Sequence, residues 1–272
     1  MTGAALALAL AAAVIHAGWN LALARQTDTE AATAIAMAVG VLAFVPVTIL
    51  TWNFSREAIP FIAVTAVLQL VYFAGLATAY RLAELSVVYP IARGVAPVIV
   101  LAVGAGLLDE TTSLRQVVGV LLIGAGVLLV RGLTRLRDAH GVLLGLAIAS
   151  VIAAYTLVDA RGVDHAGPLT YLTLAMVPAS AAYLGYVVSR GGVERVREAV
   201  SPTTLLAGVA SYLAYVLVLA ALQRAPAAAV AAVRETSIVV ATALAARILH
   251  ERVSRVRLAG AVIVVIGVAL VS

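Results

Sequence analysis

The chain has 272 residues, of which 64% are hydrophobic and 11% are charged, whereas a soluble domain has about 45–50% apolar and about 25% charged residues. A soluble protein of this length cannot bury so much apolar surface, so the composition excludes a water-soluble domain and favours a membrane protein. The formal net charge is +5, but the arginines lie mostly in short breaks between apolar runs, which argues against nucleic-acid binding. The chain has no cysteine, so it has neither disulfides nor thiolate metal sites.

Ten apolar runs are long enough to cross a membrane, since a spanning helix needs about 20 residues. The breaks between them carry charged residues or turn formers, as in Arg25–Glu30 and Asn53–Glu57. The predicted spans are residues 3–24, 32–52, 59–80, 86–108, 114–131, 141–160, 168–188, 202–223, 226–248 and 256–271. The predicted fold class is therefore an all-α polytopic membrane protein with ten transmembrane helices.

The distribution of arginine predicts the orientation. Arginines gather in the loops after the odd-numbered spans, for example in residues 131–137 and 190–197. Positively charged loops stay in the cytoplasm. An even number of spans then predicts a multi-pass protein of the inner (plasma) membrane with both termini extracytoplasmic.

The chain matches itself at an offset of 141 residues. Because each copy contains five spans, an odd number, the second copy must be inverted relative to the first, which is a transporter architecture. Residues 1–137 (spans 1–5) and 138–272 (spans 6–10) are thus predicted to be inverted five-helix repeats. The aligned pairs are Arg93 and Arg234, Glu110 and Glu251, Gly119 and Gly260, and Gly126 and Gly267.

A family resemblance rests on several segments. Leu108-Asp109-Glu110 recurs as Leu249-His250-Glu251, and this helix-end pattern resembles the repeat ending of EamA-type carriers in the drug/metabolite transporter superfamily. His16–Asn20 and Val233–Ser237 also resemble segments of one branch of that family. The resemblance covers the whole chain and implies ten helices in two inverted halves that export or exchange small metabolites.

Ionisable residues within predicted spans are candidate functional residues, because they are costly to bury. Arg93 lies about 10 Å inside its helix end, and Arg234 lies at the mirrored depth of the second repeat. They could snorkel to the interface, form a structural ion pair, or bind substrate, since guanidinium matches carboxylate and phosphonate oxygens. Glu235 could pair with Arg93 or serve as a proton-coupling carboxylate.

Other candidates share helical faces. His16, Trp19 and Asn20 have the spacing of one face near mid-membrane. They either form interhelical hydrogen bonds or line a cavity in which His16 carries a proton and Trp19 stacks on the solute. Deep tyrosines need partners for their hydroxyl groups and are candidates for cavity walls or bundle packing. They are Tyr72, Tyr89, Tyr155, Tyr212 and Tyr215.

The function predicted from these features is secondary transport of a small anionic or zwitterionic metabolite, such as an amino acid, organic acid or phosphonate-like solute. The expected partners are that solute, the lipid bilayer and a coupling proton, with the chain acting as a monomer or homodimer. The alternative is a polytopic membrane enzyme that acts on a lipid. The sequence predicts no catalytic residues, metal site or cofactor, and it has no Walker-type glycine loop with lysine.

Overall fold

Residues 1–107, 112–131, 138–248 and 254–272 are described in this computed structural model. Within them the chain is helical, apart from short turns and one isolated β-bridge between Phe54 and Ala166. Glu110 and Glu251, which the sequence repeat aligns, lie outside the described residues. The helices are α1 (Gly3–Ala24), α2 (Thr29–Leu50), the 3-10 turn η1 (Arg56–Ala58), α3 (Ile59–Leu82), α4 (Leu85–Leu107), α5 (Leu114–Arg131), α6 (Ala139–Gly162), α7 (Pro168–Glu198), α8 (Pro202–Leu222), α9 (Ala227–Arg234), α10 (Ser237–Ile248) and α11 (Arg255–Val271).

The described helices identify a multi-pass membrane protein. Eight helical segments are long and apolar enough to cross a membrane, with α9 and α10 counted as one, and Leu114–Val130 of α5 is a shorter apolar helix. Several large apolar side chains on the outside of the bundle are not covered by other residues. For example, Leu42 is 71% exposed and Leu206 is 70% exposed. Lipid is the solvent that accepts such a surface.

The predicted helix over 226–248 is interrupted. The α9 helix ends at Arg234 and α10 starts at Ser237. At the junction, the backbone N–H of Glu235 donates to the Ala232 carbonyl and that of Thr236 to the Val233 carbonyl, both at 3.0 Å. These bonds reach back three residues instead of four, which tightens the chain into a turn. The Thr236 hydroxyl also donates to the Val233 carbonyl at 2.8 Å and satisfies a helix-end acceptor.

The segment after the predicted seventh span is more helical than the sequence predicted. The predicted span ended at 188 with a loop from Arg190, but α7 extends to Glu198. Gly192, with φ 77° and ψ 170°, is not helical, so α7 consists of two helical segments joined by a kink. Glycine adopts this backbone conformation without the steric cost of a side chain. The polar residues after Gly192 therefore form a helical extension rather than a loop.

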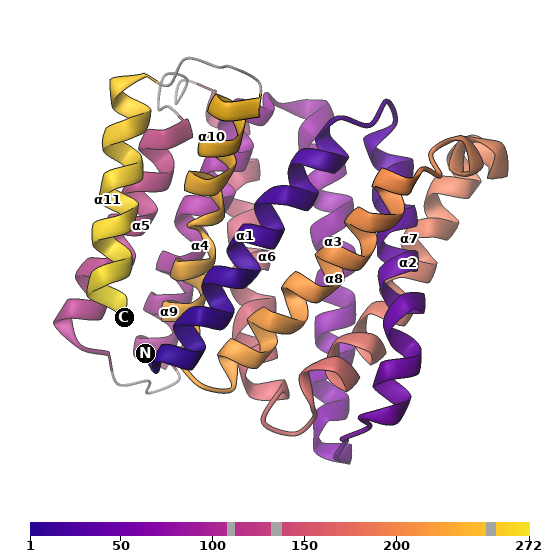
Figure 1. Cartoon of the computed structure of the whole chain (residues 1–272), viewed down its shortest axis with the longest axis horizontal. Coiled ribbons are helices and arrows are strands. Elements are labelled where there is room, and N and C mark those ends of the chain that lie inside the picture. Colours follow the sequence, from indigo (N-terminus) through magenta and orange to yellow (C-terminus); the bar gives the residue numbers. More distant parts are fainter. Residues whose placement is uncertain (108–111, 132–137, 249–253) are drawn as a thin grey trace.

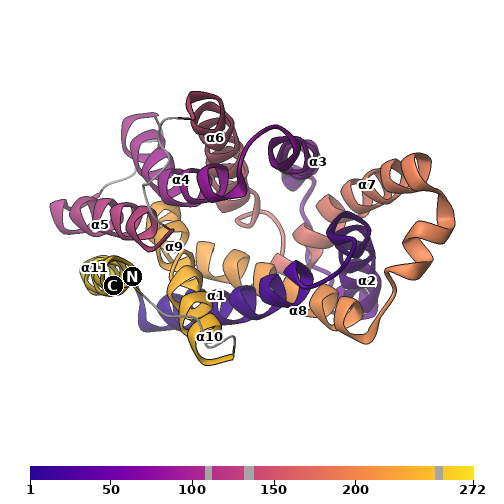
Figure 2. The same ribbon diagram turned by 90° about the horizontal axis from the view of Figure 1, so that it is seen from above.

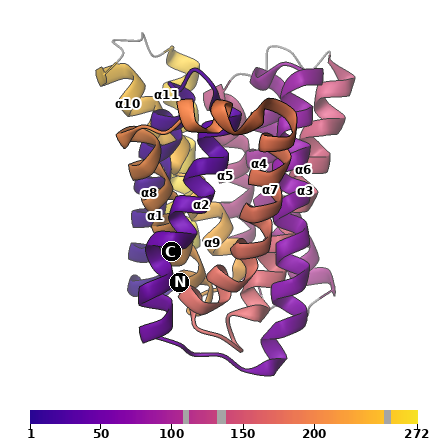
Figure 3. The same ribbon diagram turned by 90° about the vertical axis from the view of Figure 1, so that its right-hand side faces the viewer.

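The helices form two rows closed at both ends. Seen from above, α6, α4 and α3 lie in one row and α10, α1 and α8 in the other, with α9 between the rows (Figure 2). The pair α5 and α11 lies at one end of the rows, and α2 and α7 at the other. The side view in Figure 3 shows the helices running along the height of the molecule, with their connections gathered at the two ends.

Packing contacts recur in related pairs. The α1 helix packs on α8 while α6 packs on α3, and α2 contacts α8 while α7 contacts α3. The α5 and α11 helices approach closely at glycines: a Cβ built on Gly119 would lie 2.8 Å from the Gly267 carbonyl oxygen, and one on Gly126 would lie 2.8 Å from that of Gly260. These two contacts require the helices to run antiparallel.

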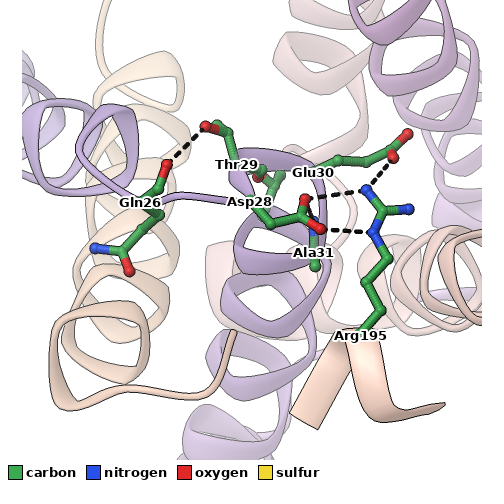
Figure 4. Close-up of polar contacts among 7 residues, drawn as sticks. Gln26, Asp28, Thr29, Glu30, Ala31 and Arg195 are labelled. Atoms are coloured by element: carbon green, nitrogen blue, oxygen red, sulfur yellow. Dashed lines mark hydrogen bonds and ion pairs between the residues drawn. The ribbon is translucent and has the colours of Figure 1, made fainter. Parts of the chain in front are cut away.

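A charged cluster joins the start of α2 to the extension of α7 (Figure 4). Arg195 donates to both carboxylate oxygens of Asp28, at 2.5 and 3.0 Å, and to Glu30 at 2.7 Å. Asp28 also caps α2 by accepting from the Ala31 N–H at 3.0 Å. The hydrogen bonds from Arg195, more than any other influence, hold the pKa of Asp28 below its usual value.

The two termini meet, because the Met1 ammonium donates to the Ser272 carbonyl at 3.2 Å.

Candidate solute-binding site

Arg93 lies on α4 between two prolines of that helix, Pro90 and Pro97, and it is 4% exposed. Its Nε is 3.2 Å from Oε2 of Glu235, and one terminal nitrogen is 2.7 Å from Nε2 of His16. The guanidinium carbon lies 5.9 Å from the centre of the Tyr89 ring, a cation–π distance. The snorkelling interpretation of Arg93 therefore fails, because the side chain turns into the bundle instead of toward its surface.

Arg234 and Glu235 lie at the break between α9 and α10, where they are 5% and 2% exposed. On a regular helix, consecutive side chains point about 100° apart, so Arg234 and Glu235 would not share a face. The turn changes that geometry: Nε of Arg234 is 3.9 Å from Oε1 of Glu235. One carboxylate thus lies between two arginines that the sequence repeat aligns.

The two arginines differ in their hydrogen bonds. Arg93 is held by Glu235 and His16, whereas the buried Nε of Arg234 has no hydrogen-bond acceptor within the described part of the chain. A buried donor without an acceptor costs about 1–3 kcal/mol. Such a group in a site is an available contact for an acceptor on a ligand.

The predicted face of α1 contacts this cluster through His16. The ring of Trp19 meets that of His16 edge-on, with centres 4.8 Å apart at 80°. Trp19 Nε1 is a second buried donor without an acceptor among the described residues. Asn20 Nδ2 instead donates to the His16 carbonyl at 3.0 Å, which is a bond within its own helix.

Apart from Tyr89, which lies against Arg93, the predicted tyrosines divide into two groups. Tyr72 on α3 meets Tyr155 on α6, with ring centres 6.0 Å apart, and Tyr155 meets Tyr215 on α8 at 6.2 Å. Tyr212 lies elsewhere: its hydroxyl is 2.5 Å from that of Thr173, and its ring stacks on Phe44. The structure therefore joins Tyr72 to an aromatic row and places Tyr212 in the packing of α2, α7 and α8.

Sequence analysis missed Asp159, which is fully buried in the last turn of α6. Its Oδ1 accepts from the hydroxyls of Thr65 at 2.6 Å and Tyr171 at 3.0 Å, and its Oδ2 accepts from that of Tyr215 at 2.5 Å. Asp159 is the last residue but one of its predicted span, where an acid normally faces water. The sequence feature that could have revealed Asp159 is its spacing of four residues from Tyr155, because this spacing places both residues on one face of a helix.

Many apolar helices around a buried cluster of charged side chains define a polytopic membrane protein with a polar interior, the class to which transporters belong. Two stretches, residues 3–132 and 139–272, match the EamA-like transporter family. The chain belongs to that family, whose members are membrane transporters of the drug/metabolite transporter superfamily.

The comparison with solved structures supports the fold. One, titled "Crystal structure of protein", superposes with a TM-score of 0.79 and 16% sequence identity, covering 99% of this chain and 98% of that one. At that identity the likeness shows the fold alone. No curated protein matches the sequence.

Proposed function

We propose that the protein is a secondary carrier that binds a small anionic or zwitterionic solute at Arg93 and Arg234 and moves it across the inner membrane by alternating access. The observation that carries the proposal is the buried Nε of Arg234, a cationic donor without an acceptor among the described residues. Arg93, Arg234 and Glu235 together leave one positive charge unneutralised in this cluster. A carboxylate, phosphate or phosphonate on the solute would neutralise that charge and supply the missing acceptor.

Alternating access needs two halves, and we assign them to residues 1–137 and 138–272 as inverted five-helix repeats. The packing supports this assignment. The sequence repeat aligns Gly119 with Gly260 and Gly126 with Gly267, yet Gly119 contacts Gly267 and Gly126 contacts Gly260. A two-fold axis exchanges contacts in this way. The matched pairs α1–α8 and α6–α3 follow the same rule.

We propose ten crossings. Eight are the candidate spans, among which α9 and α10 count together as one, and α5 and α11 each add one more. An even number of crossings would put both termini on one side. The arginine-rich loops after odd-numbered crossings are assigned to the cytoplasm, and both termini to the outside. A discontinuous helix at the substrate site is a recurrent feature of transporters built from inverted repeats.

A ligand screen tests the proposal. Carboxylates, phosphonates and amino acids are added one at a time to purified protein, and the melting temperature is measured, since a ligand stabilises the fold that binds it. We expect Arg234→Lys to weaken binding of any stabilising solute about ten- to a hundredfold, because lysine keeps the charge but loses the planar fork. Arg93→Lys should have a similar effect.

Arg224→Lys is the matched control, because Arg224 is an exposed arginine on the surface, and it should bind as the wild type does. Unchanged affinity in folded Arg93→Lys and Arg234→Lys proteins would exclude these arginines from the solute site.

A further inference from the structure

Asp159 is a buried acid that the solute site does not use. It is 0% exposed, and in the part of the chain that the structure describes no basic side chain lies within ion-pair distance of it. Its partners are three neutral hydroxyl groups from three other helices: Thr65 of α3, Tyr171 of α7 and Tyr215 of α8. An unpaired buried charge is costly to maintain, so a carboxyl group in this setting can exchange a proton with modest rearrangement.

The hydroxyl network accommodates both states of the acid. When Asp159 is a carboxylate, it accepts all three hydrogen bonds. When it is protonated, it must donate one, and a hydroxyl can accept that bond because it is both donor and acceptor. The hydroxyls of Thr65 and Tyr171 are also 2.7 Å apart, and either can be the donor. Gln69 donates to the hydroxyl of Tyr215 at 3.4 Å and extends the network along α3.

The location links this acid to the proposed transport cycle. Thr65 belongs to the first 137 residues, whereas Asp159, Tyr171 and Tyr215 belong to the rest. Hydrogen bonds to an ionised carboxylate are about twice as strong as neutral ones, so adding a proton weakens this bridge between the halves. Asp159 also lies three residues from the end of α6, a rise of about 5 Å, which leaves a short route for a proton from water.

We propose that Asp159 is a proton-binding site of the carrier, at which proton uptake loosens the contact between α3 and the helices α6, α7 and α8. A proton leaves hydronium, an O–H bond forms at one Asp159 oxygen, and water is released. The titratable and charged groups that face the site are Tyr171 from α7, Tyr215 from α8, Tyr155 on α6 itself and Arg234 from the end of α9. The transport role rests on the function proposed above, but proton binding does not require a solute.

Infrared difference spectroscopy of the full chain in liposomes tests the proposal. Spectra are recorded as the pH falls from about 8 to about 4, the range in which buried carboxylic acids can take up protons. We expect a carbonyl band of a protonated acid that is absent in Asp159→Asn and retained in Glu235→Gln. Tyr171→Phe removes a donor to the ionised form, so the band should appear about one pH unit or more higher than in the wild type.

Tyr212→Phe is the matched control, because it makes the same change on α8, where the hydroxyl contacts Thr173 instead of Asp159, and it should leave the band in place. The Tyr171→Phe shift keeps the test decisive if Asp159→Asn does not fold. Identical wild-type and Asp159→Asn spectra would overturn the proposal, as would loss of the band in Glu235→Gln alone. Since no solute is added, a failed ligand screen would leave this result intact.

Discussion

At the scale of single residues, Arg93 and Arg234 are related by the repeat but held differently. Arg93 contacts Glu235 and His16, while the Nε of Arg234 has no acceptor among the described residues. In the site proposed above, both arginines bind the solute, and Arg93 in addition holds the carboxylate of Glu235. Loss of Arg93 should therefore also affect the stability of the fold.

Arg93→Ala should lower the free energy of unfolding by about 3–5 kcal/mol, because it leaves the buried Glu235 carboxylate without its closest cation. Adding Glu235→Ala should recover much of that loss. Melting temperatures of the single and double variants measure both effects, with the exposed Arg224→Ala as control. If Arg93→Ala is as stable as the wild type, the ion pair does not stabilise the fold.

Sequence reasoning found Arg93, Arg234, Glu235 and His16, because ionisable residues inside apolar runs are conspicuous. It could not determine which arginine would find hydrogen-bond acceptors for its side chain, since that depends on the break after Arg234 and on where α1 packs. Asp159 escaped notice because a residue near a predicted span end is expected to face water. Only the packing of α3, α7 and α8 around it reveals that it is buried.

At the scale of helices, the α5–α11 pair shows how little space separates some elements. Gly119, Gly126, Gly260 and Gly267 let the two backbones approach more closely than any side chain would allow. In a membrane this close approach replaces the hydrophobic effect as a source of helix association, because lipid tails are as apolar as leucine.

Gly126→Ala should destabilise the α5–α11 pair. Its new Cβ would lie 2.7 Å from Val264 Cγ2 and 2.8 Å from the Gly260 carbonyl oxygen, an overpacked contact that costs about 1–3 kcal/mol. Gly75→Ala, which meets nothing within 4 Å, should leave the melting temperature unchanged or raise it slightly. Equal melting temperatures for the two variants would contradict the packing of α5 against α11.

Hydrophobic runs predicted where most helices lie, because span length is set by membrane thickness. They did not predict the interruption at Glu235, since no proline or glycine marks it and a turn among apolar residues has no compositional signature. They also did not predict the short helical segment after the kink at Gly192, because its polar residues resemble a loop.

At the scale of the whole molecule, polar contacts link the two parts of the chain near both ends. Asp28 and Glu30 meet Arg195 at one end, and Thr65 meets Asp159 and Tyr171 nearer the other. A carrier with alternating access must open one such contact while it keeps the other. The composition predicted a membrane protein, but contacts between residues more than 90 positions apart are invisible in a single sequence.

The Asp28–Arg195 contact predicts a dependence of stability on pH. The pKa of Asp28 is lowered in the folded protein, so its stabilising effect is present above the usual pKa of about 3.9 and is lost as the pH falls through the folded value. Asp28→Asn should therefore lower the melting temperature at neutral pH, and the difference from the wild type should shrink in acid. The exposed Glu194→Gln should show no such difference, because surface ion pairs contribute little.

The proposed orientation predicts which ends of the bundle reagents can reach in living cells. The chain has no cysteine, so single cysteines report without interference. Glu194 and Asn53 are both exposed. They lie at opposite ends of the bundle, Glu194 after the seventh proposed crossing and Asn53 after the second. If arginine-rich loops face the cytoplasm, a membrane-impermeant maleimide should label Asn53→Cys in intact cells and leave Glu194→Cys unlabelled. Both should label after the cells are broken, which controls for reactivity. Labelling of Glu194→Cys alone in intact cells would reverse the orientation and place both termini in the cytoplasm.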